Sequence, residues 1–441
     1  ALSLGYHNKE GLMPNTNYDK FSVRSNIDAK INKRLDVSLN LSAYRDHMKS
    51  PVSGVGNIVY NAFRESPVMP IQYQNGNYGL FLNNTNSVAF ARNGGVSNIY
   101  NNNFLGSVSL NYKIIEGLFL KGIASTSFNL KDQHDFAKQM DFYQPDSNTP
   151  YITKRSSVKN NDNKMLEVNL QAYLNYDKTF GKHNIKGLLG YSQIYNQYRI
   201  LEATRKDLPA NNNLGEINAG DENTQTTSGN LVEYALRSAF ARVNYVYDDR
   251  YLFEANIRRD GSSHFGANNK WGVFPSFSLG WNVWNEPYLA KMKPEWFDVL
   301  KFRFSWGQNG NESIGDFRYR ALMSGGQNYY FGGSYKPNMN DFTKPGENGG
   351  AMIYGTSPAA AANPDIKWET STQTDFGIDM RFLNQRLSFG FDYYYKKTTD
   401  MLAEMPVPTY IGQSKPWGNL GSMENWGIEM ELGWKDNIKD F

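Results

Sequence analysis

The chain has 441 residues, a net charge of +3 and no cysteine. Nearly balanced acids and bases do not indicate nucleic-acid binding, and the missing thiols exclude disulfide frameworks, thiol catalysis and cysteine-ligated metals. Mean hydropathy is negative, and no window holds the roughly 18 apolar residues that a transmembrane helix needs. Two classes are left: a soluble protein, or a membrane β-barrel whose strands hide their apolar half by alternation.

Aromatic residues make up 15% of the chain, and the 29 tyrosines are the largest group among them. Tyrosine and tryptophan collect where hydrocarbon meets water, so this content favours the barrel. Proline and glycine are scattered rather than gathered into a linker, so residues 1–441 are expected to belong to one β structure.

Apolar and polar residues alternate with a period of two from the first residues onward, which predicts strands with one apolar and one polar face. The clearest case lies after residue 275, where Phe277, Leu279 and Trp281 alternate with serine, glycine and asparagine. The pattern predicts about 14 strands, at 2–6, 21–31, 35–43, 108–114, 118–130, 166–176, 185–199, 231–247, 251–259, 276–283, 302–306, 376–382, 387–395 and 428–434.

Short and long connections are predicted to alternate strictly. Tight turns are expected at 32–34, 116–117, 181–182, 248–249 and 384–385, and long connections at 49–103, before 163, before 229, at 308–366 and at 403–425. A connection at 286–298 has room for a helical turn. Short periplasmic turns and long extracellular loops are the outer-membrane barrel pattern, whereas a soluble sandwich or propeller has no reason to sort its loops.

The soluble alternative remains open on pattern alone, because the apolar face of a β-sandwich is its core. In that case Phe389, Phe391, Leu170 and Leu174 would be buried between two stacked layers. A soluble or surface all-β carbohydrate-binding protein is therefore the alternative from another class, and a barrel enzyme is a third possibility.

No enzyme active site, cofactor site or metal site is predicted. The five histidines are far apart and none has ligand spacing. The nucleophile elbow, the P-loop and the H-E-x-x-H motif are absent from the sequence. Turn chemistry explains the acidic run at 221–223 better than a cation site does.

Several segments resemble a known family. They are RRDGSSHFGANNKWGVFPSFSLGW from Arg258, LKFRFSWGQNGNESIGDFRYRA from Leu300, LSLGYHNKEG from Leu2, the segment 363–402, and NLGSMENWGIEMELGW from Asn419. Together they resemble the barrel of the SusC/RagA family of TonB-dependent outer-membrane transporters. The signature residues, read as structural, are Arg258, Arg259, Asp260, Gly261, Ser262, Ser263, Phe265, Gly266, Trp271, Gly272, Pro275, Ser276, Gly280 and Trp281.

The resemblance implies an all-β, antiparallel transmembrane barrel of about 22 strands, in the outer membrane of a Gram-negative bacterium. Residues 1–441 would be its central part, with an N-terminal plug domain and the terminal strands missing. It also implies import of oligosaccharides, or alternatively of peptides. The implied partners are TonB, a SusD-like lipoprotein over the extracellular mouth, and outer-membrane lipid.

Two groups of residues have two interpretations each. The loop aromatics could contact sugar faces or peptide side chains, or they could pack the loops together; these residues are Tyr329, Tyr330, Phe331, Tyr410 and Trp417. The signature charges could line a solute path, or they could pair across neighbouring strands and hold the rim in register; they are Arg258, Arg259, Asp260 and Lys270.

Overall fold

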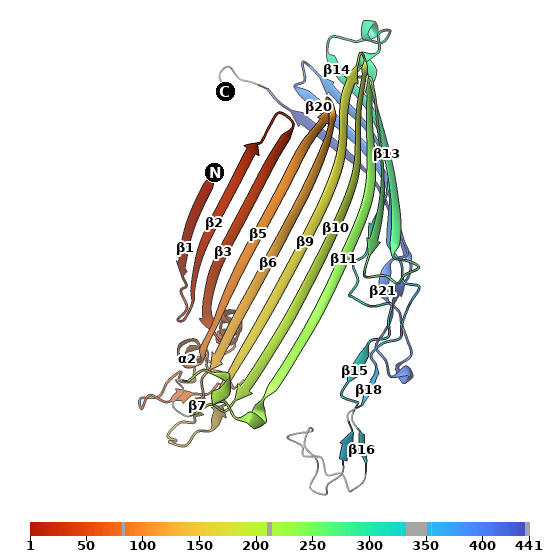
Figure 1. The fold of residues 1–441 in the computed structure, drawn as a ribbon. Helices are drawn as coiled ribbons and strands as arrows, with labels where there is room; N and C mark the ends of the chain where they lie inside the picture. The colour runs from red at the N-terminus through yellow and green to blue at the C-terminus, as the bar shows by residue number, and fades with distance from the viewer. Residues whose placement is uncertain (82–83, 210–213, 328, 332–350, 354, 437–441) are drawn as a thin grey trace. The chain divides into compact units, whose positions relative to one another are not determined.

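The fold was taken from a computed structural model, which describes the chain except residues 82–83, 210–213, 328, 332–350, 354 and 437–441 (Figure 1). The chain consists of two compact units. The first comprises Ala1–Tyr112, Lys121–Gln171 and Ile194–Glu233, and the second Lys113–Leu120, Ala172–Gln193 and Tyr234–Phe441.

One sheet of 14 strands dominates the described residues, as the sequence predicts. Each strand pairs with the next one of the sheet along the chain, so the topology is an up-and-down meander with β1 and β23 at the edges. The strands are β1 Leu2–Glu10, β2 Asn17–Lys30, β3 Leu35–Pro51, β5 Gly95–Ile115, β6 Leu118–Ala137, β9 Ser157–Phe180, β10 His183–Lys206, β11 Thr226–Tyr247, β12 Tyr251–Ser262, β13 Trp271–Asn282, β14 Phe297–Asn311, β19 Glu369–Phe382, β20 Leu387–Thr399 and β23 Ser422–Trp434.

In the second unit, the antiparallel register gathers apolar side chains on one face of the sheet. One row crosses six strands from β12 to β23, and its members are Phe253, Leu279, Phe304, Phe376, Tyr393 and Ile428. Five of these six side chains are between 39% and 60% exposed. Such exposure is expected of a face that meets hydrocarbon rather than another protein layer.

The next row along the same strands lies on the opposite face and is mostly polar: Glu254, Ser278, Ser305, Asp375, Tyr394 and Gly427. The predicted two-faced wall is therefore present. None of the four residues that a sandwich would bury is buried: Leu170 is 45% exposed, and Leu174, Phe389 and Phe391 are half-buried.

The tight turns lie where the sequence predicts them. Asp248 and Asp249 both adopt positive φ, at 50° and 53°, as two-residue hairpin turns require. Gly117 has a φ of 81°, and a Cβ there would lie 2.7 Å from the carbonyl oxygen of Asp177, so only glycine fits.

Strict alternation of short and long connections is wrong, because the connections 11–16 and 263–270 of the long series are short and one connection of the tight-turn series is long. The connection 283–296 belongs to the tight-turn series, yet it holds the 3-10 helices η3 (Val283–Asn285) and η4 (Ala290–Met292). Trp284 and Trp296 pack edge-on and stacked against Phe297, so this longer connection forms its own aromatic cluster.

Several strands extend well beyond the predicted ends. Residues 95–103 were expected in a loop but form the start of β5, and β9 begins at Ser157 rather than near 166. These extensions are mostly polar and lack a regular apolar face, with side chains such as Asn98 and Asn160. Alternation therefore disappears in them although the ladder of backbone hydrogen bonds continues.

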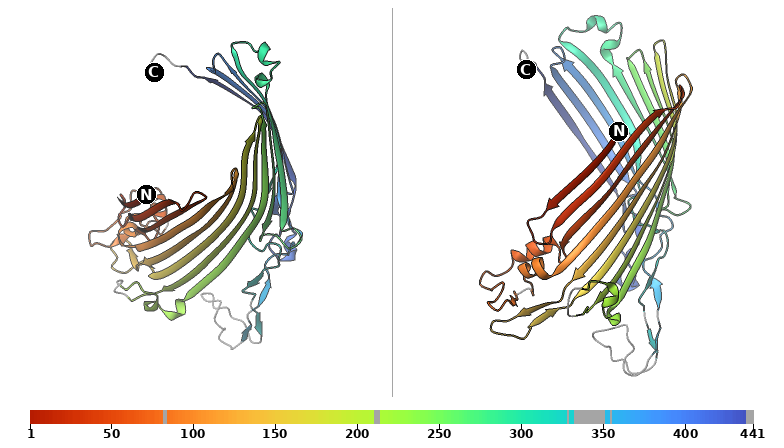
Figure 2. Two further views of the ribbon diagram at one scale, coloured as in Figure 1. Left: turned by 45° about the horizontal axis from the view of Figure 1, so that its top comes forward. Right: turned by 60° about the vertical axis from the view of Figure 1, so that its left-hand side comes forward.

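The connections of the first unit carry two short helices and a small separate sheet. Helices α1 (Val55–Ala62) and α2 (Ser87–Asn93) lie together beyond the ends of β3 and β5 (Figure 2). Ala89 of α2 packs with Met140 and Phe142 of β7 (Met140–Tyr143) in a small buried core, and β7 joins β4 (Tyr78–Gly79) and β8 (Ile152–Lys154) in a separate sheet. In the described part of the chain, no helix is long and apolar enough to cross a membrane.

Replacing Leu279 by lysine tests the assignment of the apolar face. Leu279→Lys places an ammonium group between Phe253 and Phe304, and lysine on a lipid face near the bilayer centre costs about 2–4 kcal/mol. We expect the free energy of unfolding of the full-length protein in lipid vesicles, measured by urea titration, to fall by that amount. Ser278→Lys, next to it on the polar face, should cost less than about 1 kcal/mol. Equal losses for the two variants would contradict the assigned faces.

Candidate functional site

The signature strands β12 and β13 divide their residues between the two faces. Arg258, Asp260 and Ser262 share the polar face with the facing positions Gly272, Ser276 and Gly280. Arg259, Gly261, Trp271, Pro275 and Trp281 share the apolar face. Ser263, Phe265 and Gly266 lie in the connection between the two strands. The signature therefore does not form a single site.

The signature charges make three different contacts. The Nε atom of Arg258 donates to both carboxylate oxygens of Asp260 at 2.8 Å, and its Nη2 atom donates to the hydroxyl of Ser238 across the strand pair at 2.9 Å. Arg259 lies on the other face, with its guanidinium carbon 4.6 Å from the ring centroid of Trp271. Lys270 contributes its carbonyl oxygen, which accepts from Trp368 Nε1 at 3.1 Å.

A second charge cluster on the polar face was not predicted from the sequence. Arg303 of β14 donates to Asp379 of β19 at 2.8 and 2.9 Å, and its Nη1 atom lies 3.1 Å from Asp392 of β20. Gly377 leaves room for this group, since a Cβ there would lie 2.7 Å from the guanidinium carbon and 2.4 Å from an Asp392 oxygen. All three charges occupy polar positions in the alternation, but only the strand register reveals their contact.

A cavity of about 340 Å³ adjoins this cluster within the second unit. Its polar lining brings together Glu254, Lys301, Arg303 and Asp375. Ser305 donates to Asp375 at 2.9 Å, and Asn256 donates to Glu254 at 2.9 Å. This surface offers hydrogen-bond donors and acceptors of both charge signs, which suits a polar solute.

A buried hydrophobic cluster joins the β12–β13 connection to both ends of the long connection 312–368. Its members are Phe265, Phe274, Ile314, Ile366 and Trp368, with Trp417 packed against them. The ring of Phe274 lies over Gly272 and Gly310, where a Cβ would come within 2.4 and 2.1 Å of it. This close approach explains why the signature has glycine at 272, and we call the group the loop-base cluster.

Polar contacts surround the loop-base cluster. His264 Nε2 lies 3.2 Å from Asp316, and its Nδ1 atom lies 3.1 Å from the carbonyl oxygen of Glu312. The hydroxyl of Tyr234 donates to the Glu312 carboxylate at 2.5 Å. Asn269 donates to the carbonyl of Asp365 at 2.9 Å, so the bases of the two connections are tied together.

The structure does not bring the predicted loop aromatics into one site. Tyr329 in β16 (Tyr329–Phe331) is 64% exposed, and Tyr410 in η5 (Thr409–Ile411) is 87% exposed. Trp417 of β22 (Trp417–Asn419) packs against the loop-base cluster, as the packing interpretation expects. The side chains of Tyr330 and Phe331 lie outside the described residues.

A charged cluster occupies the tight-turn end of β12. Arg250 contacts Asp248 at 2.8 Å and the buried carboxylate of Glu286 at 3.1 Å, and Lys182 contacts Asp248 at 2.8 Å. The hydrogen bond from Lys182, supported by Arg250, lowers the pKa of the Asp248 carboxyl. A hydrogen bond from Tyr251, followed by that from Arg250, lowers the pKa of the Glu286 carboxyl.

Within the described residues, no group of three or more histidine, aspartate or glutamate side chains is arranged to hold a metal ion. Two arginines of the polar face, Arg258 and Arg303, are instead paired with carboxylates.

An antiparallel meander with an exposed apolar face and a polar face defines the wall of a membrane β-barrel. Residues 130–439 match the family described as TonB dependent receptor-like, beta-barrel, and the chain belongs to this family. Its members are outer-membrane proteins of Gram-negative bacteria and are transporters rather than enzymes. The soluble alternative is therefore wrong, and the recognition of the family from the sequence is confirmed.

The similarity to known TonB-dependent receptors extends over nearly the whole chain. TonB-dependent receptor P3 of Formosa agariphila is 31% identical over 98% of this chain and 41% of that protein. TonB-dependent receptor SusC of Bacteroides thetaiotaomicron is 26% identical over 100% of this chain and 44% of that protein. The RagAB peptide importer in its closed-closed state has a TM-score of 0.76 at 23% identity, over 100% of this chain and 47% of that one. The chain thus spans less than half the length of each of these proteins.

Gly377→Ala tests the Arg303 cluster. The new methyl group would displace Arg303 from Asp392, and overpacking of this kind costs about 1–3 kcal/mol. We expect the unfolding free energy of the full-length protein to fall by that amount. The matched control is Gly390→Ala on the facing strand, where a Cβ would meet no atom closer than 3.8 Å; its stability should be unchanged. An undisturbed Gly377→Ala variant would contradict the close packing described here.

The lowered pKa of Glu286 predicts acid sensitivity of the tight-turn end. A carboxyl with a lowered pKa in the folded state stabilises the fold above its unfolded value, about 4.3, and loses this contribution as the pH falls through the folded value. Glu286→Gln should therefore be less stable at neutral pH and should lose less stability below about pH 4.3. Thermal unfolding across this range measures both effects. Glu116→Gln, at an exposed position in another tight turn, should behave like the unaltered protein.

Proposed function

We propose that residues 1–441 form the central part of the barrel of an active importer of the SusC/RagA type. In the full-length protein, an N-terminal plug fills the barrel and contacts TonB, which supplies the energy. A SusD-like lipoprotein covers the extracellular mouth. The proposed cargo is an oligosaccharide, taken up as a nutrient without any catalytic step.

The observation that carries this proposal is the pairing of two arginines with carboxylates on the polar face of the second unit. Arg258 is matched by Asp260, and Arg303 by Asp379 and Asp392. Between these pairs lie hydroxyl and amide groups such as Ser305 and Asn256. Where such pairs cancel the charge of the wall, its surface offers hydrogen bonds without favouring a net charge in the solute, which suits a neutral glycan.

The exposed loop tyrosines support the same cargo. Tyr329 and Tyr410 are mostly exposed, on the connections 312–368 and 400–421. A ring with a polar edge can stack on the apolar face of a sugar while its hydroxyl group bonds to neighbouring hydroxyls.

A peptide is the second candidate. The structural relative that covers the whole chain is called a peptide importer. The cavity beside Arg303 also presents Lys301 and Glu254, groups that could pair with peptide termini and charged side chains.

Growth of a deletion strain distinguishes the two cargoes. The strain lacking the full-length gene should fail to grow on a panel of defined oligosaccharides as sole carbon source, and it should keep its growth on defined peptides. Recovery with the full-length gene is the control. Failure on peptides with unchanged growth on oligosaccharides would reverse the assignment.

In the same strain, we expect Tyr410→Ala to raise the oligosaccharide concentration for half-maximal growth about five- to tenfold, because a lost ring contact is worth about 1–1.5 kcal/mol. Tyr288→Ala is the matched control, since Tyr288 is exposed too, at 63%, but lies in the connection 283–296 of the tight-turn series. Equal effects of the two variants would exclude Tyr410 from recognition.

A further inference from the structure

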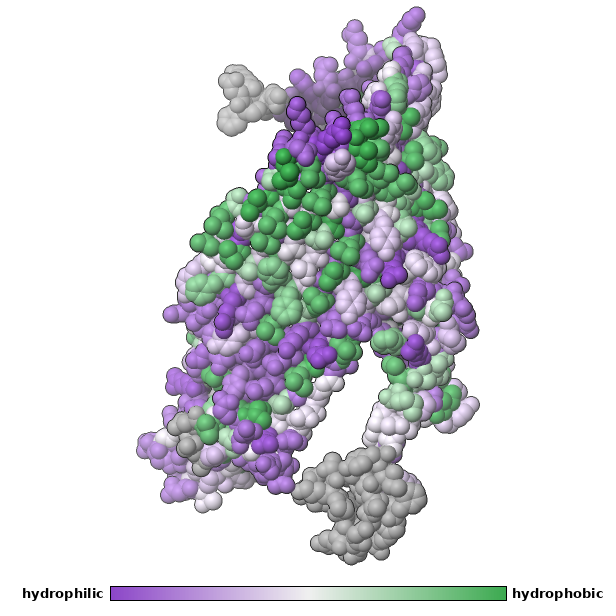
Figure 3. Space-filling view, viewed as in Figure 1, coloured by the Kyte–Doolittle hydropathy of each residue, from purple (hydrophilic) through white to green (hydrophobic). Residues whose placement is uncertain are grey.

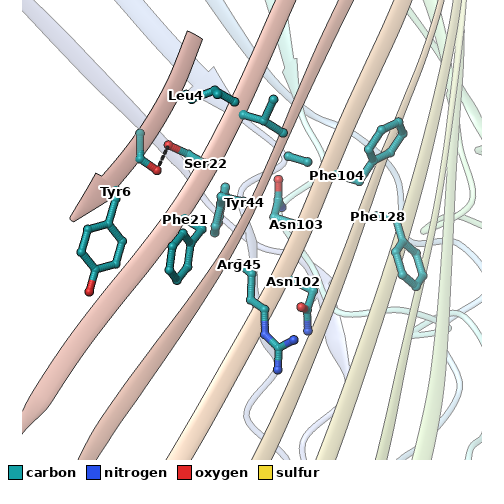
Figure 4. Close-up of a pocket in the computed structure, with 13 residues that line it drawn as sticks. Leu4, Tyr6, Phe21, Ser22, Tyr44, Arg45, Asn102, Asn103, Phe104 and Phe128 are labelled. Atoms are coloured by element: carbon teal, nitrogen blue, oxygen red, sulfur yellow. Dashed lines mark hydrogen bonds between the residues drawn. The ribbon is translucent and has the colours of Figure 1, made fainter. Parts of the chain in front are cut away.

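The first unit carries an apolar groove of about 790 Å³ on its apolar face, across β1, β2, β3, β5 and β6 (Figure 4). Hydrophobic side chains gather on this face across the middle of the strands, between polar zones toward both ends (Figure 3). The groove lies within this band, and its volume is that of a small-molecule site.

A small residue between large ones creates the groove. The register places Ala43 between Val23 and Phe104 on neighbouring strands. Leu4, Tyr6 and Phe21 line one side, and Phe128 stands on the other side (Figure 4). Tyr6 and Phe21 pack with ring centroids 4.7 Å apart, which gives that side a continuous aromatic wall.

One end of the groove is polar. Arg45 and Asn102 are register partners at that end, on the side of the groove where β3 and β5 lead into the long connection 52–94. Arg45 is exposed and has no carboxylate partner among the described residues. Its guanidinium carbon lies 5.1 Å from the ring centroid of Tyr100, and that ring stacks on His47 at 4.3 Å. The cation is thus held in place but left without a counter-ion.

These features define the occupant by its chemistry. It must be apolar along its length, accessible from the hydrocarbon phase, and anionic at the end that reaches Arg45. Arginine recognises phosphate through two parallel N–H donors, and Asn102 adds an amide donor. Because the long connections of such barrels are extracellular, the polar end faces the outer leaflet, whose phosphate-bearing lipid in Gram-negative bacteria is lipid A.

We propose that this groove binds one acyl chain of lipid A, with a lipid A phosphate on Arg45. The aromatic wall packs against the chain, and Ala43 provides the space for it. The assignment rests on membership of an outer-membrane family and not on the cargo, so it stands or falls independently of the proposed import of oligosaccharides.

Native mass spectrometry of the full-length protein tests the proposal. The purified, delipidated protein is titrated with monophosphoryl lipid A, with the same lipid after dephosphorylation, and with phosphatidylglycerol. We expect monophosphoryl lipid A to bind about tenfold more tightly than the dephosphorylated lipid, since a charge-assisted contact is worth about 1.4 kcal/mol. It should also bind more tightly than phosphatidylglycerol, because its phosphate is a monoester that carries more negative charge than a phosphodiester. Equal binding of the dephosphorylated lipid or of phosphatidylglycerol would overturn the proposal.

Two variants and two matched controls locate the site. Arg45→Gln removes the cation, and Ala43→Phe fills the groove; each should weaken binding of monophosphoryl lipid A about tenfold. The controls are Arg259→Gln, another exposed arginine of the apolar face over an aromatic ring, and Ala255→Phe, an alanine of that face outside the groove. Both should bind as the unaltered protein does. Heat-modified migration on gels confirms that each variant is folded, and folded Arg45→Gln and Ala43→Phe variants that bind normally would refute the site.

Discussion

The register between neighbouring strands decides on which side of the sheet every side chain lies. Moving one strand by a single residue would exchange its two faces. For β14, such a slip would turn Phe302, Phe304 and Trp306 toward the polar side and Arg303 toward hydrocarbon. Both changes are unfavourable at once, because a buried arginine loses its two carboxylates and the aromatic rings meet water. The polar pairs and the exposed apolar face therefore enforce the same register.

Much of the wall could be predicted from the sequence because membrane strands expose a pattern of period two. The tight turns at 116–117 and 248–249, and the apolar row through Leu279 and Phe376, follow from alternation and turn chemistry. The polar extensions of β5 and β9 could not be predicted in this way. Beyond the apolar band both faces of the sheet are mostly polar. A strand and a loop therefore have similar compositions there.

Sites formed by residues from strands that are distant in the sequence could not be predicted either. Arg303 and Asp392 are 89 residues apart in the sequence, and only the ladder through β19 places them together. Only the three-dimensional structure could distinguish the two interpretations of the loop aromatics. Trp417 packs at the loop base, whereas Tyr410 is exposed, although both lie in the same aromatic-rich connection. The groove around Ala43 could not be predicted from the sequence of a single strand, because side chains of the neighbouring strands form it.

The loop-base cluster fixes both ends of the connection 312–368, so the residues between them can vary without disturbing the strands. Ile314 and Ile366, near the two ends of that connection, both pack into one buried cluster with Phe274. With its ends held, doubling the length of the segment between them costs only about 0.6 kcal/mol of closure entropy. Insertions and wholesale exchange of residues there would leave the hairpins beneath intact. Evolution could thus change the sequence of this connection while the strands beneath it keep their packing.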